Sequence, residues 1–300
     1  MSLDTALRVR TCGKVNLFLR VLGQRPDGFH EVETILHSVG VCDEIEVAPT
    51  GGVVDVEMRL VPGLNGALPK DDENLVLRAA DALRRGRTDR GARIMVEKGI
   101  PIAAGLGGGS ADAAATLVVL SDLWGLELGR DELMSIAESL GSDVPYCLEG
   151  GTVLATARGE QLTPLAQMTP MWFVLAGTAA PLLTRDVYAA WDHLRPAEEA
   201  SSAVISMALG AGDVAEVASS LLNELEPAAF SLMPELESKK QTLLDAGALG
   251  AGMTGSGPTM YALATTEEEA RSIAADVEGR FDWIQVVRSQ GRSIYGLDRP

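Results

Sequence analysis

The sequence has few aromatic residues and no long hydrophobic run. Phe, Trp and Tyr together make up 4% of its 300 residues, so the core must consist mainly of aliphatic side chains. No stretch approaches the roughly 20 apolar residues that a membrane helix requires. Asp4 precedes any apolar stretch, and Arg8 and Arg10 follow soon after, which is not the order of a signal peptide. We therefore expect a soluble cytoplasmic protein that does not associate with membranes.

Cysteine is also scarce. The chain has 3 cysteines, Cys12, Cys42 and Cys147, which are widely spaced and include no Cys-x-x-Cys pair. This pattern suggests neither a disulfide framework nor a zinc knuckle. We expect all of them to be reduced, as in a cytoplasmic protein.

Basic residues are outnumbered by acidic ones. The 25 Lys and Arg residues face 42 Asp and Glu residues, which gives a formal net charge of −17. A field of this sign repels duplex nucleic acids and anionic membrane surfaces, so neither is expected as a partner. A small anionic ligand remains possible, because a few local cations and backbone N–H groups can outweigh a distant net charge.

The length of 300 residues suggests two domains, because it is about twice that of a usual domain. Apolar periodicity breaks between residues 159 and 170, which predicts domains at 1–164 and 165–300. Hydrophobic periodicity and turn residues predict strands at 8–22, 31–38, 44–48, 53–60, 92–98, 171–176, 260–264 and 283–288, and helices at 73–85, 111–123, 130–140, 186–194, 214–225, 234–246 and 267–279. The strands cluster early, which favours two mixed α+β halves over alternating βαβ units.

A glycine-rich segment reads Gly105-Leu-Gly-Gly-Gly-Ser110 and joins a predicted strand to a predicted helix. Ser110 stands where an N-cap belongs, and successive backbone N–H groups at a helix start form an anion site suited to phosphate. The segment is neither a Walker A loop nor a G-x-G-x-x-G motif. A glycine-rich turn without a ligand is the alternative, although the flanking strand and helix favour phosphate.

Residues 101–114, Pro-Ile-Ala-Ala-Gly-Leu-Gly-Gly-Gly-Ser-Ala-Asp-Ala-Ala, resemble the nucleotide loop of the GHMP kinase family. Two more motifs of this family follow the expected order, Lys14-Val-Asn16 near the N-terminus and a glycine loop at residues 250–257. Residues 25–30, 73–75 and 141–145 are similar to the branch that phosphorylates a cytidine diphosphate derivative in the non-mevalonate isoprenoid pathway. The resemblance implies a two-domain α+β fold: an N-terminal nucleotide-binding domain with a mixed sheet and a C-terminal ferredoxin-like α+β domain.

The resemblance also implies the nucleotide site. The cofactor is ATP, used as Mg-ATP, and no dedicated protein metal site is expected. The residues expected to bind ATP are Asn74, Pro101, Ile102, Ala103, Ala104, Gly105, Leu106, Gly107, Gly108, Gly109, Ser110 and Ala111. Ala111 departs from the family, in which a second Ser often stands at this position.

Lys14 and Asp143 are the catalytic residues that the resemblance implies. An isolated Asp in a turn is usually only turn chemistry, and an isolated Lys on a strand is usually solvated. In the family, however, the matching Asp is the catalytic carboxylate and the matching Lys lies beside it. Phosphoryl transfer needs a group that orients or deprotonates the hydroxyl, which Asp143 would supply, while Lys14 would stabilise negative charge that develops there.

The acceptor is expected to be a small molecule that contains a cytidine diphosphate group. A neutral His30 can hydrogen-bond the edge of a pyrimidine base, and Tyr188 matches the position that stacks on the base in the family. Burial of Tyr188 in the core is an equally good interpretation. The residues expected to bind the acceptor are Asn16, Phe29, His30, Thr184 and Tyr188.

Two alternatives for the function remain. One is another GHMP small-molecule kinase, of the homoserine or mevalonate type. The other is a catalytically inactive nucleotide-binding protein on the same scaffold, which would not need Lys14 and Asp143. The quaternary structure is expected to be a monomer or a weak homodimer.

Overall fold

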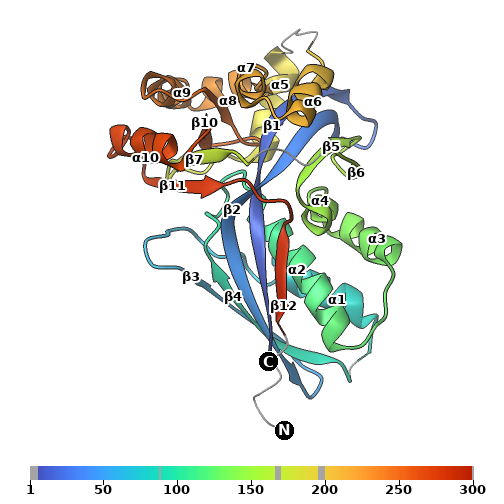
Figure 1. The fold of residues 1–300 in the computed structure, drawn as a ribbon. Helices are drawn as coiled ribbons and strands as arrows, with labels where there is room; N and C mark the ends of the chain where they lie inside the picture. Colours follow the sequence, from blue (N-terminus) through green and yellow to red (C-terminus); the bar gives the residue numbers. More distant parts are fainter. Residues whose placement is uncertain (1–5, 88, 166–169, 195–199, 299–300) are drawn as a thin grey trace.

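The described strands form two separate sheets, each with its own helices (Figure 1). The computed structural model describes residues 6–87, 89–165, 170–194 and 200–298. The eight-stranded sheet runs from the bottom of Figure 1 to its upper right, and the four-stranded sheet lies at the upper left. Two mixed α+β halves, as predicted, are confirmed. The division of the chain at residue 164 stays a prediction.

The larger sheet is built around a long antiparallel hairpin of β1 (Leu7–Gln24) and β2 (His30–Thr50). Its main order is β12-β1-β2-β4-β3, with β5 and β6 continuing from β2 and β8 beside β1. The sheet is mixed, because β3 and β8 run parallel to their neighbours and the other pairs are antiparallel. The remaining strands are β3 (Val54–Leu60), β4 (Gly91–Lys98), β5 (Thr152–Thr156), β6 (Gln161–Pro164), β8 (Leu222–Asn223) and β12 (Ile294–Asp298).

Four helices pack beside this sheet, in the order α1 (Leu75–Arg84), α2 (Gly108–Leu123), α3 (Arg130–Leu140) and α4 (Val144–Glu149). α2 contacts β1 and β2 on one side and α1 and α4 on the others (Figure 1). Its alanines at 111, 113, 114 and 115 are fully buried. Small side chains let a helix that is enclosed on several sides pack closely, so the alanine-rich sequence fits this position.

The smaller sheet is antiparallel, with the order β11-β7-β10-β9. α9 packs on β9 and β10, and α10 packs on β7, β10 and β11. The strands are β7 (Trp172–Gly177), β9 (Gly250–Met253), β10 (Met260–Ala264) and β11 (Trp283–Arg288). The helices of this half are α5 (Thr184–Leu194), α6 (Ser202–Ala211), α7 (Val214–Ser219), α8 (Glu226–Leu232), α9 (Glu235–Asp245) and α10 (Glu267–Asp276).

Three local predictions were wrong. The strands expected at 31–38 and 44–48 are one strand, β2, because irregularities in its register with β1 let it continue through the break in the pattern. The helix expected at 214–225 ends at Ser219, and the chain then pairs with β1 as β8. Helix α2 begins before Ser110, with Gly107 at the N-cap position.

The prediction of three reduced cysteines was also wrong. Cys12 and Cys42 form a disulfide, whereas Cys147 is free and buried. The pairing follows from the register of the hairpin, in which Cys12 lies directly opposite Cys42 with their Cα atoms 4.0 Å apart. Sequence spacing alone does not reveal that register.

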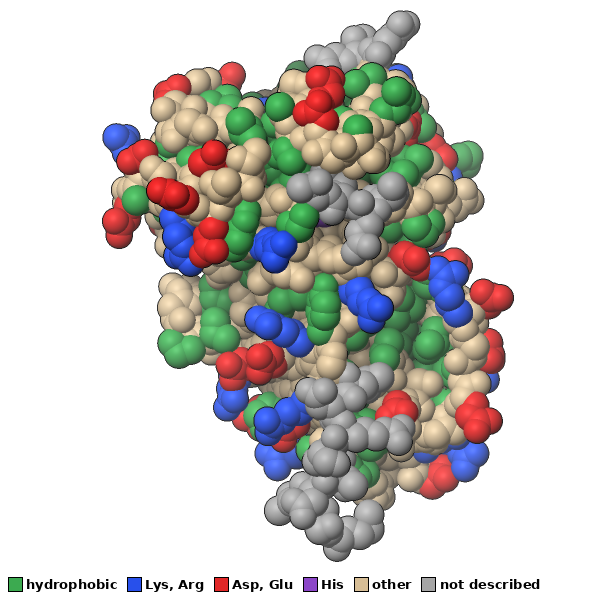
Figure 2. Space-filling model, in the orientation of Figure 1, with side chains coloured by type: hydrophobic (Ala, Val, Ile, Leu, Met, Phe, Trp, Pro, Cys, Tyr) green, Lys and Arg blue, Asp and Glu red, His purple; other side chains and the backbone are tan. Residues whose placement is uncertain are grey.

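On the face of the molecule shown in Figure 2, acidic and basic side chains are interspersed. None of the described helices has the length and apolar character needed to cross a membrane.

Candidate active site

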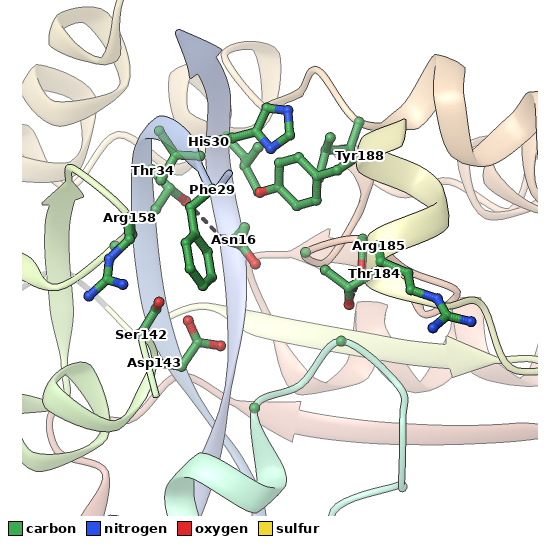
Figure 3. Close-up of a pocket in the computed structure, with 18 of the residues that line it drawn as sticks. Asn16, Phe29, His30, Thr34, Ser142, Asp143, Arg158, Thr184, Arg185 and Tyr188 are labelled. Atoms are coloured by element: carbon green, nitrogen blue, oxygen red, sulfur yellow. Dashed lines mark hydrogen bonds between the residues drawn. The ribbon is translucent and has the colours of Figure 1, made fainter. Parts of the chain in front are cut away.

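A cavity of about 750 Å³ lies where the two halves meet. The long hairpin supplies Lys14, Asn16 and His30. The turn before α4 supplies Asp143, and α5 supplies Tyr188 (Figure 3). The structure therefore brings both predicted catalytic residues and all five predicted acceptor-binding residues to one cavity: Lys14, Asp143, Asn16, Phe29, His30, Thr184 and Tyr188.

Lys14 is buried and held by a chain of hydrogen bonds. Its Nζ donates to Asn16 Oδ1 at 2.8 Å, Asn16 Nδ2 donates to Thr34 Oγ1 at 2.8 Å, and Thr34 Oγ1 donates to the Phe18 carbonyl at 2.6 Å. Burial lowers the pKa of Lys14, and the nearby Asp143 partly opposes this shift. Lys14 and Asn16 thus form one fixed unit on the cavity wall.

Asp143 occupies the N-cap position of α4, yet its side chain does not cap the helix. Pro145 stands in the first turn, where a missing N–H costs no hydrogen bond. Figure 3 shows the Asp143 carboxylate below Phe29 and beside Ser142, toward the interior of the cavity. A carboxylate that is not used for capping is available to contact a ligand.

The glycine loop forms a second cavity of about 430 Å³. All but one of the predicted ATP-binding residues line it, namely Asn74 and residues 101–110. The exception is Ala111, which is fully buried behind the loop, where its carbonyl accepts a hydrogen bond from Thr11. Asn74 serves as the N-cap of α1, because its Oδ1 accepts from the Val76 N–H at 3.0 Å.

The two cavities share part of the glycine loop. Gly105, Gly107 and Ser110 line both of them. Gly107 has φ of 74°, a left-handed conformation that glycine adopts without strain. A Cβ atom at Gly107 would lie 3.2 Å from Lys14 Cγ and 3.9 Å from Asp143 Oδ2. A phosphate at this loop would therefore lie beside the two predicted catalytic residues.

Residues of the C-terminal half, including its own glycine loop, form hydrogen bonds to the glycine loop at residues 105–110 and to β1. Thr254 Oγ1 donates to the Gly105 carbonyl at 3.0 Å, and the Tyr261 hydroxyl donates to the Asn16 carbonyl at 2.9 Å. Asn223 Nδ2 donates to the carbonyls of Met253 and Gly255 at 2.8 Å each. The position of the phosphate loop consequently depends on both halves of the molecule.

At the other end of the large cavity, His30 stacks on Tyr188 with 4.6 Å between the ring centroids and 30° between the planes. His30 Nε2 lies 2.9 Å from Asp192 Oδ1. Phe29 is 53% exposed and lies between this pair and Asp143 (Figure 3). Thr184 forms a hydrogen bond with the Ser256 hydroxyl at 2.9 Å. Burial raises the pKa of the Tyr188 phenol, so it is neutral. The Tyr188 ring is half-buried: it packs against the core of the C-terminal half and also lines the cavity, so both interpretations remain.

Behind the glycine loop lies a buried charge cluster that the sequence did not reveal. Lys98 Nζ donates to Asp112 Oδ2 at 2.6 Å and also to Asp43 Oδ2. Asp43 Oδ1 accepts from the N–H groups of Gly99 and Ile100 at 2.7 and 2.8 Å. Burial alone would lower the pKa of Lys98, but the two carboxylates together raise it. Burial raises the pKa of Asp112 well above its usual range. The cluster joins β2 and the end of β4 to the N-terminal half of α2.

The cavity lining also includes residues that the sequence analysis did not identify, among them Arg158 and Asp192. Arg158 follows β5 and belongs to none of the recognised motifs, whereas Asp192 lies one helical turn after Tyr188 on α5. The sequence offered one indication of Arg158, namely that it is a single basic residue in the turn Ala157-Arg-Gly159.

The described residues contain no group of three or more His, Cys, Asp or Glu side chains placed to hold a metal ion. The shared wall of the cavities offers the Ser110 hydroxyl, and Asp143 lies on the acceptor side. Magnesium is commonly held by one or two protein oxygens together with substrate phosphates. These residues therefore fit a magnesium ion that arrives with ATP.

Comparison with known families matches two parts of the chain. Residues 74–151 match the N-terminal domain of GHMP kinases, and residues 205–282 match the C-terminal domain of the same kinases. The first region contains the glycine loop and Asp143, and the second contains the loop at Thr254.

Several named relatives are similar over most of the chain. A 4-diphosphocytidyl-2-C-methyl-D-erythritol kinase of Pelotomaculum thermopropionicum is 44% identical over 279 residues, which is 92% of this chain and 95% of that protein. The protein of the same name from Mycolicibacterium gilvum is 42% identical over 283 residues, covering 91% and 87% of the two chains.

Solved structures of several kinases superimpose on the chain. A crystal structure of a 4-(cytidine 5'-diphospho)-2C-methyl-D-erythritol kinase superimposes with a TM-score of 0.80 at 32% identity, covering 95% of this chain and 99% of the other. The homoserine kinase of Cytophaga hutchinsonii gives a TM-score of 0.73 at 24% identity, covering 98% of each chain. A mevalonate kinase of L. major gives 0.74 at 20% identity, covering 94% of this chain and 95% of the other. At this lower identity, the last two structures show the shared fold alone.

Proposed function

The chain belongs to the GHMP kinase family, and from this premise we propose that it is the ATP-dependent kinase of 4-diphosphocytidyl-2-C-methyl-D-erythritol. It transfers the γ-phosphate of ATP to the 2-hydroxyl of that acceptor, a step of the non-mevalonate isoprenoid pathway. A relative of that name is 44% identical over most of the chain. The homoserine and mevalonate kinases share only the fold, so they support those two alternatives less well.

The observation that carries this proposal is the junction of the two cavities. Gly105, Gly107 and Ser110 belong to both, and Lys14 and Asp143 lie on the acceptor side of this shared wall. Phosphoryl transfer requires the phosphate, the hydroxyl and the charge-stabilising groups to be close and in line. A nucleotide on the glycine loop and an alcohol in the large cavity would meet at this junction.

We assign the roles of the site residues as follows. The backbone of residues 105–110 binds the phosphates of ATP, and Asn74 contacts another part of the nucleotide from the wall of the same cavity. Asp143 orients or deprotonates the attacking hydroxyl, and Lys14 stabilises the charge that develops there. Asn16 fixes the Lys14 ammonium through its 2.8 Å hydrogen bond and contacts the acceptor.

The other end of the cavity suits a pyrimidine base. His30 and Tyr188 form a stacked pair there, and Phe29 offers a second aromatic face. Aromatic faces and a ring nitrogen are the groups that bind a planar base by stacking and hydrogen bonding. Homoserine and mevalonate contain no base and would leave this end of the cavity without a ligand group.

ATP is used as Mg-ATP. Magnesium when bound neutralises charge on the β- and γ-phosphates and so favours transfer. The residues nearest to it would be Ser110 on the loop and Asp143 on the acceptor side. A cytoplasmic location and a monomer or weak homodimer stay predictions; sedimentation analysis of the purified protein tests the second.

The test of the proposed function is a comparison of acceptors. The purified protein is incubated with Mg-ATP and 4-diphosphocytidyl-2-C-methyl-D-erythritol, homoserine or mevalonate, and the products are identified by mass spectrometry. We expect a phosphorylated product with the cytidine acceptor and little turnover of the other two. Preferred phosphorylation of homoserine or mevalonate would contradict the proposal. ATP binding without any product would indicate the inactive nucleotide-binding alternative.

A further inference from the structure

The acceptor named above carries a diphosphate between its base and its alcohol, and the protein must place these negative charges in a chain of net charge −17. The base end of the cavity is marked by His30, and the reacting end by Asp143. Among the described residues that line the cavity, three are Lys or Arg: Lys14, Arg158 and Arg185. The diphosphate must lie between the two ends, so the position of each cation decides which of them can reach it.

Lys14 and Arg185 are poorly placed for this task. The Lys14 ammonium belongs to the reacting end, where it donates to Asn16. The Arg185 side chain is 83% exposed and pairs with Asp186. In Figure 3 it extends on the side of the cavity opposite Asp143. A mobile, solvated cation contributes little to binding because water screens its charge.

Arg158 lies between the two ends. Its guanidinium carbon is 5.0 Å from the centre of the Phe29 ring, and its side chain is 31% exposed. Figure 3 shows Arg158 and Phe29 side by side, with His30 above them and Asp143 below. A guanidinium in this position can donate to non-bridging phosphate oxygens while Phe29 packs against the nucleoside.

The backbone around Arg158 is held in an uncommon conformation. The preceding residue, Ala157, is buried and has φ of 61°, in the left-handed region that side chains other than glycine rarely adopt. Its carbonyl accepts a hydrogen bond from the Val32 N–H at 2.7 Å. Strain of this kind persists where the surrounding structure requires it, and it often marks functional positions.

Glu160 completes the support of Arg158. Its Oε2 accepts from the Arg158 backbone N–H at 2.8 Å, and its Oε1 lies 3.6 Å from Arg158 Nε. A guanidinium carries five N–H donors, so one contact at Nε leaves the terminal nitrogens for a ligand. The side chain is thus both oriented and able to bind an anion.

We propose that Arg158 binds the diphosphate of the acceptor and thereby selects a nucleoside diphosphate over a nucleoside. This inference rests on the proposed function, and it adds a subsite between the base and the reacting hydroxyl.

The experiment compares the wild type, Arg158→Gln and the matched control Arg185→Gln. Calorimetry measures binding of cytidine diphosphate and of cytidine, with the nucleotide site filled by a non-hydrolysable ATP analogue. Charge-assisted hydrogen bonds support a loss of about 10- to 100-fold in cytidine diphosphate affinity for Arg158→Gln. We expect the affinity of Arg158→Gln for cytidine to change less than about threefold. In the control Arg185→Gln, the affinities for cytidine diphosphate and for cytidine should both change less than about threefold.

Kinetics give an independent result. Arg158→Gln should raise the KM for the cytidine acceptor by a similar factor, with the KM for ATP unchanged and a smaller effect on kcat. Arg158→Lys should restore part of the loss, because it keeps the charge but not the bidentate geometry. Urea unfolding of each variant verifies that the fold is intact.

Equal losses for cytidine diphosphate and cytidine would overturn the proposal, because Arg158 would then support Phe29 and the base. So would a wild type that does not prefer cytidine diphosphate, or a loss confined to Arg185→Gln. In each of these cases, continued turnover of the cytidine acceptor by the wild type would leave the proposed function standing.

Discussion

Gly107 is the residue at which the geometry makes the sharpest prediction, and the perturbation is Gly107→Ala. Its φ of 74° is left-handed, and an alanine held there costs about 1–2 kcal/mol. The new Cβ would lie 3.2 Å from Lys14 Cγ and 3.4 Å from Lys14 Cε. Lys14 is buried and hydrogen-bonded, so it has little freedom to move away.

Two consequences follow for Gly107→Ala. The free energy of unfolding should fall by about 1–2 kcal/mol, the cost of the left-handed alanine. The ammonium of Lys14 should shift by a few tenths of an ångström, and displacements approaching 1 Å in an active site can cost about 100-fold in rate. We expect kcat to fall at least about tenfold and the KM for ATP to rise.

Steady-state kinetics with both substrates, together with urea unfolding, measure these effects. Gly210→Ala is the matched control, because Gly210 lies in α6 and a Cβ there would meet nothing within 4 Å. Alanine in a helix is favoured over glycine by up to about 1 kcal/mol, so this variant should keep its activity and its stability. A Gly107→Ala enzyme with normal kcat and normal KM for ATP would refute the reasoning.

Two further predictions concern buried titratable groups, His37 and the Lys98 cluster. Burial lowers the pKa of His37 to about 4, whereas the unfolded chain has a value near 6.5, so protons bind preferentially to the unfolded state between these values. The free energy of unfolding should therefore fall by up to about 3 kcal/mol as the pH drops from about 6.5 to 4. Urea titrations at several pH values measure this dependence. If His37→Gln shows the same change of unfolding free energy with pH as the wild type, His37 is not its source. Lys98→Met leaves the carboxylates of Asp43 and Asp112 without their ammonium and should cost about 3–5 kcal/mol. The control Arg59→Met removes an exposed ion pair and should lower the free energy of unfolding by less than about 1 kcal/mol. Equal losses for the two variants in urea unfolding would show that the buried cluster stabilises the fold no more than an exposed ion pair does.

Much of the architecture was predictable because its signals are local. Helical periodicity gave residues 130–140, which are the bounds of α3, and strand patterns gave the bounds of β10 and β11. Patterns of this kind depend only on which face of an element is buried. The short elements β6, β8 and α4 have too few residues for a period to be visible.

The remaining features depend on pairing between distant segments. The disulfide of Cys12 with Cys42 requires the register of the long hairpin, and the Lys98 cluster joins three elements. Ser110 appeared to be an N-cap because its residue type favours that position, but a left-handed glycine begins the helix earlier. Register and backbone angles of this kind follow from tertiary packing, which a single sequence does not display.

The site was predictable to the extent that its motifs are contiguous. Lys14, Asn16, His30, Asp143 and the glycine loop stand in short motifs, and the structure brings them together around the two joined cavities. Arg158 and Asp192 have no such motif, and only their place on the cavity wall identifies them. Their roles depend on side-chain geometry that no spacing rule conveys.

The central claim is that Asp143 and Lys14 act together on the attacking hydroxyl where the two cavities meet. Its most direct test is the single-turnover rate of phosphoryl transfer from labelled ATP to the cytidine acceptor in Asp143→Asn, with Lys14→Met and the double variant alongside. Asp81→Asn, on an exposed side chain of α1, is the control for loss of one carboxylate.

General-base contributions are typically about 10²–10⁴-fold, so the Asp143→Asn rate should fall within this range while both substrates still bind. The double variant should be scarcely slower than the slower single variant, because groups that act as one unit are not additive. Multiplying losses would show that Lys14 and Asp143 act on separate steps. A near-normal rate for Asp143→Asn would contradict the account.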